Sequence, residues 1–200
     1  TYIQRRAILK KTVGSGLLLF LGNDETGLNY EDNNFRYRQD SSFLYYFGLS
    51  FAGLAAIIDI DEDKEIIFGD ELTIDAIVWM GTQPTLKEKS ERVGISLNMP
   101  ASDLSRYLTK AQEKGQTVHY LPPYRSEHKI KLMELLKLPI GNQEGSVPFI
   151  KAIVAQRSYK SAEEIIEIEK ACDITADMHI AAIKAVRPGI MEYEIAALIE

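Results

Sequence analysis

The chain has 200 residues and a formal net charge of −6, from 23 Lys and Arg against 29 Asp and Glu. Its 46% hydrophobic content is typical of a globular protein, and its length allows one ordinary domain plus part of another. The acidic balance argues against nucleic acid as a partner, and no apolar run is long enough to predict a membrane span. The single cysteine, Cys172, excludes an internal disulfide and favours a reducing, cytoplasmic compartment.

The N-terminal segment predicts a helix followed by a buried strand. Residues 1–13 suggest an amphipathic helix, and we expect its buried face to carry Ile3, Ala7, Ile8 and Val13. Gly14-Ser15-Gly16 ends this helix. Because these glycines follow a helix and not a strand, they do not predict a dinucleotide-binding loop. Residues 17–21 are all apolar and predict a central strand.

A polar loop and an aromatic segment come next. Residues 22–34 are rich in Asn, Asp and Gly and predict a loop. Residues 35–48 read as a polar turn followed by an aromatic strand. In that turn Asp40 and the serines after it can accept backbone N–H groups, and Arg38 can pair with a carboxylate. This segment therefore has a structural interpretation, which we favour, and a functional one.

The middle of the chain alternates strands with helices. Residues 54–60 and 65–68 predict a hairpin, with further strands at 95–99 and 116–121. Helices are expected at 84–93, 102–114 and 127–136, and a short helix or linker at 149–156. The lone tryptophan, Trp79, belongs to the segment 73–81, and such a residue is usually part of a core. The pattern predicts an α/β fold, with a mixed β-sheet flanked by helices.

The C-terminal segment predicts a long helix that belongs to a second domain. Ser161 and Glu164 form the S-x-x-E pattern of a capping box, and an apolar stripe continues from there to about residue 185. Pro188-Gly189 ends the helix, and a second helical pattern beginning near Met191 is still running at Glu200. We therefore expect one domain over residues 1–156 and the truncated start of another over residues 157–200.

Two stretches resemble a known family. The segment R-x-x-K-S-x-E-E-I-x-x-I-E-x-A from Arg157, with the later Arg187-Pro188-Gly189, resembles the opening of the pita-bread catalytic domain of Xaa-Pro peptidases. The R-Q-D-S-S-F-x-Y-x-x-G segment from Arg38 resembles a motif of the N-terminal domain of the same group, which comprises aminopeptidase P, prolidase and creatinase. The resemblance implies a metallopeptidase that hydrolyses the peptide bond preceding proline.

The resemblance also implies a location for the substrate-binding residues. A W-x-G motif in such enzymes lies on the face of the N-terminal domain that closes over the substrate, in some cases in a neighbouring subunit's active site, and Trp79 matches it. Asp32 matches an acidic position on the same face, and Arg38 and Asp40 belong to the adjoining loop. For Trp79 the substrate-pocket wall and the plain core remain alternatives.

The catalytic chemistry is expected beyond residue 200. The family's two divalent ions, typically manganese, are held by aspartates, glutamates and a histidine that map to no position here. The resemblance therefore implies no catalytic residue, metal site or cofactor in this chain, which is expected to be inactive alone. Proline-containing peptides are the implied substrates of the parent protein. A homo-oligomer, either a dimer or a tetramer, is its implied assembly.

Other readings of the sequence stay open. In a homologue that lacks the metal ligands, the same domain would serve as a non-catalytic module that binds peptides or proteins. Creatinase, which uses no metal, is a third possibility, and aminopeptidase and dipeptidase activities are not separated by the residues present. Among the remaining candidate groups, His119 and His128 are expected to be structural or exposed, and Cys172 to be a packed thiol.

Overall fold

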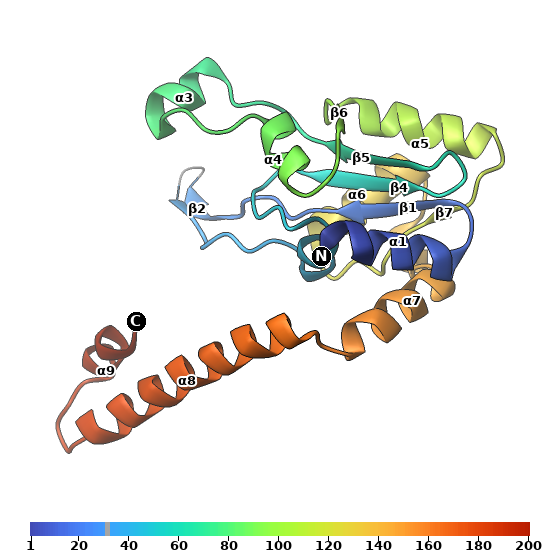
Figure 1. Cartoon of the computed structure of the whole chain (residues 1–200). Helices are drawn as coiled ribbons and strands as arrows, with labels where there is room; N and C mark the ends of the chain where they lie inside the picture. Colours follow the sequence, from blue (N-terminus) through green and yellow to red (C-terminus); the bar gives the residue numbers. More distant parts are fainter. Residues whose placement is uncertain (31–32) are drawn as a thin grey trace. The chain divides into compact units, whose positions relative to one another are not determined.

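The computed structural model describes residues 1–30 and 33–200 (Figure 1). It divides into two compact units, Thr1–Gln156 and Arg157–Glu200, and each is described by itself. The first unit holds the sheet and most of the helices, and the second holds only helices in its described residues.

A mixed sheet forms the centre of the first unit. In the described residues it has five strands, in the order β6-β5-β4-β1-β7. Strand β1 pairs antiparallel with β4 and parallel with β7, while β5 pairs antiparallel with β4 and parallel with β6. The strands are β1 (Leu17–Leu21), β4 (Ala55–Asp59), β5 (Lys64–Phe68), β6 (Leu97–Met99) and β7 (Val118–His119). The predicted mixed sheet and the hairpin of β4 and β5 are confirmed.

Helices cover both faces of this sheet, because alternate side chains of its central strands point to opposite sides. Leu18 and Phe20 of β1 join one apolar cluster, and Leu17 and Leu19 join the other. The first cluster includes residues of α1 (Tyr2–Val13), α2 (Ser41–Phe47), α4 (Leu86–Arg92) and α7 (Val147–Ser158). The second includes residues of α5 (Asp103–Glu113) and α6 (Ser126–Leu136). The unit is therefore a three-layer α/β structure (Figure 1).

The aromatic segment after Asp40 is a helix, so the predicted strand is wrong there. The Asp40 carboxylate accepts the backbone N–H groups of Ser42 and Phe43, both at 2.9 Å, and this cap starts α2. Phe43, Tyr46 and Phe47 are separated by three and four residues, so they share one helix face, and all three are fully buried. Gly48, in the left-handed conformation at φ 65°, ends the helix.

Two further expectations are corrected. The predicted loop at residues 22–34 contains a small antiparallel pair, β2 (Gly27–Tyr30) and β3 (Asn33–Asn34). In α1 the expected apolar face is not the buried one, because Ile3 and Ile8 are 61% and 53% exposed. The fully buried residues of α1 are instead Leu9 and Arg6, whose charged group has partners inside the fold.

The second unit consists of α8 (Ala162–Ala185) and α9 (Glu192–Ile199). The predicted capping box is present, since Glu164 N–H donates to Ser161 Oγ at 3.2 Å and Ser161 N–H to the Glu164 carboxylate at 2.9 Å. Within the described chain, neither helix has a buried residue, and Cys172 is exposed, so its predicted packing is wrong in this structure. Of the helices described, none is both long and apolar enough to cross a membrane.

Candidate functional site

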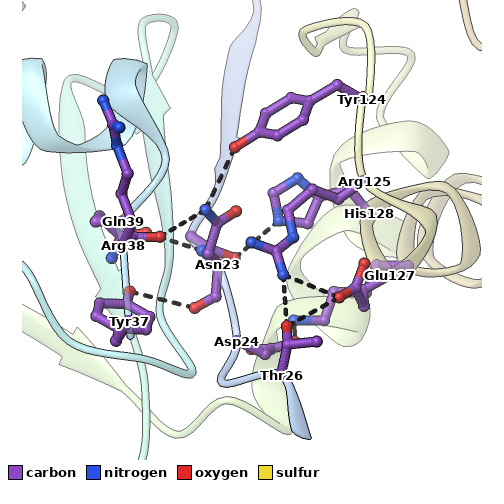
Figure 2. Close-up of polar contacts among 12 residues, drawn as sticks. Asn23, Asp24, Thr26, Tyr37, Arg38, Gln39, Tyr124, Arg125, Glu127 and His128 are labelled. Atoms are coloured by element: carbon purple, nitrogen blue, oxygen red, sulfur yellow. Dashed lines mark hydrogen bonds and ion pairs between the residues drawn. The ribbon is translucent and has the colours of Figure 1, made fainter. Parts of the chain in front are cut away.

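A group of polar side chains lies where two parallel neighbouring strands of the first unit end. We call this region the crevice; the residues around it include Asn23, Tyr37, Gln39, Tyr124, Arg125 and His128 (Figure 2). Strand β1 ends at Leu21, and its parallel partner β7 ends at His119. From β1 the chain continues toward β4 on one side, whereas β7 lies on the other side of β1. Open α/β sheets bind ligands most often in such a crevice at the carboxyl ends of their strands. Figure 2 shows the residues that surround this edge.

Gln39 holds the loop after β1 in place. It is 3% exposed, and its Oε1 accepts the N–H groups of Asn23, at 2.8 Å, and Asp40, at 2.9 Å. Its Nε2 donates to the carbonyl oxygens of Leu49 and Phe51, at 3.2 and 3.0 Å. Both ends of this amide are therefore used to join three loops, and Gln39 is a positioning residue of the crevice.

Asn23 lies between the Arg38 segment and Tyr124 and is 2% exposed. Its Nδ2 donates to the carbonyl oxygen of Arg38 at 2.8 Å and to the hydroxyl of Tyr124 at 3.3 Å (Figure 2). Among the described residues its Oδ1 has no hydrogen-bond partner, although the atom is buried. A buried acceptor without a donor is rare in folded proteins and points to a bound water or ligand group.

His128 connects the start of α6 to the end of β1. Its Nε2 lies 2.9 Å from the carbonyl oxygen of Gly22, which fits a protonated Nε2 that donates to this oxygen. Burial lowers the pKa of His128, and the hydrogen bond with Gly22 and the carboxylate of Asp40 oppose this only in part. A neutral imidazole at this position serves packing, and this agrees with the structural role expected for His128.

Arg125 is fixed at the edge of the same crevice. Its Nη2 donates to Thr26 Oγ1 at 2.5 Å and to the Glu127 carboxylate at 3.2 Å (Figure 2). The Glu127 pKa is lowered, first by its own backbone N–H and then by the bond from Arg125. The guanidinium is thus oriented by two partners through one of its terminal nitrogens.

Tyr37 faces Arg125 across the crevice entrance. Its hydroxyl donates to the carbonyl oxygen of Asn23 at 3.3 Å. Burial, followed by the charge of Asp24, raises the pKa of Tyr37 to about 12. Asp24 itself pairs with Lys131 at 2.6 Å. The phenol therefore stays protonated at neutral pH and acts as a hydrogen-bond donor.

Of the four residues predicted to bind substrate, the structure places the side chain of Asp40 at the crevice. The Asp40 carboxylate caps α2 and also lines a small cavity of about 40 Å³ with Tyr124 and His128. Arg38 is exposed, and Figure 2 shows its side chain leaving the segment on the side opposite to Tyr37. Asp32, the third predicted residue, lies outside the described residues.

Trp79, the fourth predicted residue, lies on α3 (Ile74–Met80), apart from the crevice. The side chain is 87% exposed, so the core alternative for Trp79 is wrong. Ile74, Val78 and Met80 of the same helix are also 60–81% exposed, and no residue of this fully described helix is buried. Figure 1 shows α3 at the periphery of its unit, away from the sheet. The helix is nevertheless well defined, because Thr73 Oγ1 caps it by accepting the N–H of Ala76 at 3.1 Å.

A mostly apolar cavity of about 600 Å³ lies beside α3. Ile77 and Met80 line it from α3, Leu86 and Lys89 from α4, and Phe51 from the loop after α2. Its volume is within the usual range for small-molecule sites. The exposed apolar helix and this cavity together form a second candidate surface, whose lining shares Glu25 with a cavity at the crevice entrance.

Sequence reasoning did not single out Asn23, Gln39 or Arg125. The motif that contains Gln39 was recognised, but its amide was not assigned the role of joining loops. Asn23 and Arg125 follow the apolar strand 17–21 and the strand predicted at 116–121, and this position after a strand was the available signal. It could not be used without knowing that β1 and β7 are parallel neighbours.

The described residues contain no group of three or more His, Cys, Asp or Glu side chains placed to hold a metal ion. The residues present therefore do not fit a two-metal centre, and no reaction step is assigned to a metal in this chain.

The fold is that of an α/β domain with a mixed sheet, and a polar crevice lies at the carboxyl ends of its parallel strands β1 and β7. The family model for the aminopeptidase P N-terminal domain matches residues 2–119, more than half of the chain. The chain therefore belongs to this family, and the resemblance noted from its motifs is confirmed.

Relatives of known activity are similar over most of the chain. The Xaa-Pro aminopeptidase of Escherichia coli K12 is 24% identical over 203 residues, which cover 96% of this chain and 46% of the relative. The human Xaa-Pro dipeptidase is 24% identical over 185 residues, covering 92% of this chain and 37% of the relative. This chain spans less than half the length of either enzyme.

Solved structures support the same fold. Pseudomonas aeruginosa aminopeptidase PepP superposes with a TM-score of 0.80 at 23% identity, covering 99% of this chain and 47% of that one. The low-pH form of E. coli aminopeptidase P gives a TM-score of 0.78 at 22% identity, with the same coverage. At these identities the structures establish the fold alone.

Proposed function

We propose that this chain is the N-terminal part of an Xaa-Pro peptidase, an aminopeptidase or dipeptidase that hydrolyses the bond preceding proline. The observation that carries the proposal is the alignment of more than nine-tenths of the chain with Xaa-Pro peptidases of both kinds. The parts of the parent protein that align with the remainder of those relatives would supply the catalytic residues.

The role proposed for the first unit is to shape access of the peptide to the catalytic centre. Trp79 supports this role, since an indole held at 87% exposure on a short capped helix is available to pack against another surface. Aromatic rings provide large apolar area with few rotatable bonds, which suits contact with a proline ring. Asp32, Arg38 and Asp40 would belong to the same substrate-facing surface.

The parent protein is further proposed to use two divalent ions, with manganese as the expected metal, and to act in the cytoplasm as a homo-oligomer. The metal would supply Lewis-acid activation of water in the remainder of the parent. The residues of this chain would orient the peptide and restrict the length of substrate that enters. Proline-containing peptides are its proposed substrates.

The proposal is tested by comparing the 200-residue chain with the protein encoded by the longer reading frame. Release of proline from an Xaa-Pro dipeptide, and of the N-terminal residue from an Xaa-Pro-Xaa tripeptide, is measured with and without Mn²⁺. We expect hydrolysis by the longer protein, its loss with a chelator, and no hydrolysis by the 200 residues alone. Which of the two substrates is cleaved distinguishes dipeptidase from aminopeptidase.

The substrate-facing role has its own readout in the longer protein. Trp79→Ala is expected to raise KM several-fold, and the matched control Ile130→Ala, which removes a half-exposed apolar side chain from α6, is expected to leave KM unchanged. If the longer protein lacks the metal ligands and binds proline peptides without hydrolysing them, the peptidase proposal fails. The chain would then be the binding module of an inactive homologue. Equal effects of the two substitutions on KM would show that Trp79 does not contact the substrate.

A further inference from the structure

A cavity at the crevice entrance is lined by several arginines, although the chain as a whole is acidic. It has a volume of about 300 Å³, and its lining includes Arg36, Arg38 and Arg125. These are three of the nine arginines in a chain whose net charge is −6. Two of these residues, Arg36 and Arg125, supply the guanidinium groups that could serve the cavity, and guanidinium groups at one cavity favour an anion as its ligand.

The arginines at this cavity keep donors available. Over residues 1–30 and 33–200, the side chains of Arg36 and Arg38 take part in no hydrogen bond or ion pair. Arg125 uses only Nη2 within the described part of the chain, for Thr26 and Glu127. Figure 2 shows its other terminal nitrogen turned away from these two partners. The Arg38 side chain points away from Tyr37 (Figure 2), so the oriented guanidinium of Arg125 and the exposed one of Arg36 are the groups able to donate to a ligand in this cavity.

The acidic residues of the lining are already engaged. Asp24 pairs with Lys131 at 2.6 Å, and the Glu25 carboxylate accepts a hydrogen bond from Asn34 at 3.1 Å. Their presence limits the excess positive charge at the cavity, which favours a singly charged carboxylate over a doubly charged phosphate. Tyr37, whose raised pKa keeps its hydroxyl protonated, borders the same cavity.

We propose that this cavity is a binding site for a carboxylate of a peptide, with Arg125 as its fixed anchor and Arg36 as an exposed second donor. The site lies at the carboxyl ends of β1 and β7, and its lining shares Glu25 with the apolar cavity beside α3. This inference rests on the proposed function, because it takes peptides as the ligands that reach this surface. It extends that function by assigning a preference for peptides whose free carboxylate binds in this cavity.

The test uses the 200-residue chain, which does not need to be catalytically active. The peptide acetyl-Gly-Pro-Gly-Gly is titrated with its free C-terminal carboxylate and as the C-terminal amide, at constant ionic strength held with sodium chloride. Backbone and arginine side-chain NMR signals are followed. We expect the free acid to shift the signals of Thr26, Tyr37 and Arg125, and the amide to bind at least about tenfold more weakly, because it loses a charge-assisted hydrogen bond.

Substitutions assign the binding to the arginines. Arg125→Gln is expected to weaken the free acid about tenfold and Arg36→Gln about threefold, since each removes a donor to the carboxylate. Arg36 is exposed, and its side chain makes no hydrogen bond or ion pair within the described part of the chain, so its substitution tests the site even if Arg125→Gln disturbs the local fold. The matched control is Arg106→Gln on α5, which removes an exposed arginine paired with Asp103. It is expected to change nothing.

Three results would overturn the site. These are equal binding of the acid and the amide, equal weakening by Arg106→Gln and Arg36→Gln, or the same shifts from sodium chloride alone. Inorganic phosphate serves as the competing probe. If phosphate displaces the peptide at lower concentration than acetate does, the site is a phosphate site and the carboxylate assignment is wrong. Because no hydrolysis is measured in this experiment, a negative result does not bear on the peptidase proposal, which the hydrolysis assay tests separately.

Discussion

The Arg6 guanidinium and the Glu65 carboxylate form an ion pair at 2.7 Å, in which the arginine side chain is fully buried and the glutamate 17% exposed. Arg6 also donates from Nη1 to the carbonyl oxygen of Tyr46 and from Nη2 to that of Val93, each at 2.9 Å. One side chain thus joins α1 to β5, to the end of α2 and to the turn after α4. A buried charge is tolerated here because each of the three guanidinium nitrogens donates to an acceptor.

Removing this side chain is predicted to be strongly destabilising. Arg6→Met keeps apolar bulk but leaves the buried Tyr46 and Val93 carbonyl oxygens without their donor and breaks the pair with Glu65. We expect a loss of about 3–5 kcal/mol in the free energy of unfolding, measured by urea denaturation. Arg106→Met, which breaks an exposed pair with Asp103, is expected to cost less than about 1 kcal/mol. Similar losses for the two variants would contradict the role assigned to Arg6.

Gln39 offers a test in which size does not change. In Gln39→Glu, a carboxylate oxygen replaces the nitrogen that donates to the Leu49 and Phe51 carbonyl oxygens, so acceptors face acceptors. We predict a loss of about 2–4 kcal/mol in the free energy of unfolding at neutral pH, because a buried group becomes charged and one of its oxygens faces two carbonyl oxygens without a donor. Gln112→Glu makes the same change at an exposed position of α5 and is expected to stay within about 0.5 kcal/mol of the parent protein.

The cap of α2 predicts how Asp40 contributes to stability. Asp40→Ala removes the acceptor for the N–H groups of Ser42 and Phe43 and is expected to cost about 1 kcal/mol in thermal or urea unfolding. Asp40→Asn keeps an oxygen in that place and should cost less. If both variants unfold like the parent chain, the cap does not hold α2. If the longer protein shows an unchanged KM with Asp40→Asn, the carboxylate charge has no role in substrate binding.

Exposure of Trp79 is directly measurable, because it is the only tryptophan. Its indole is 87% exposed, so we predict acrylamide quenching close to that of N-acetyltryptophanamide in the 200-residue chain at low concentration. Quenching that falls as protein concentration rises would show that α3 becomes covered by another copy. A strongly protected indole at every concentration would contradict the position of α3 in this structure.

The order of helices and strands was predictable wherever one periodicity dominated. The strand at Leu17–Leu21, the hairpin of β4 and β5, and the capping box of Ser161 and Glu164 are each set by a few neighbouring residues. The prediction for the aromatic segment of α2 was wrong for an identifiable reason: its run of closely spaced aromatic residues suggested a strand, and three of them, Phe43, Tyr46 and Phe47, form the buried helix face. Their spacing of three and four, and the Asp40 cap before them, were the better signals.

The tertiary contacts were less predictable. Apolar residues of α1 suggested a buried face that included Ile3 and Ile8, yet the fold buries Arg6, because its partners come from distant parts of the chain. The crevice depends on the parallel pairing of β1 with β7, which lie about a hundred residues apart. Local sequence patterns do not encode such a pairing, so Asn23 and Arg125 could not be placed together.

His128 predicts how stability depends on pH. Burial lowers its pKa below the ordinary value of 6.5, so the folded chain favours the neutral ring that donates to Gly22. The carboxylates of Asp40 and Asp24 and the ammonium of Lys131 also act on this ring. Stability from the neutral ring is therefore fully present above pH 6.5 and is lost as the pH falls through the lowered pKa of the folded state.

The measurement is urea denaturation of the parent chain and of His128→Gln between pH 8 and pH 5. The parent is expected to lose stability over this range, and His128→Gln to lose less, because glutamine cannot be protonated there. His119, whose pKa burial also lowers, contributes a residual dependence of the same sign. The free energy of unfolding of the double variant with His119→Gln should therefore depend on pH even less. If His128→Gln retains the full pH dependence of the parent, the imidazole of His128 is already solvated in the folded state, and the buried contact with Gly22 does not persist in solution.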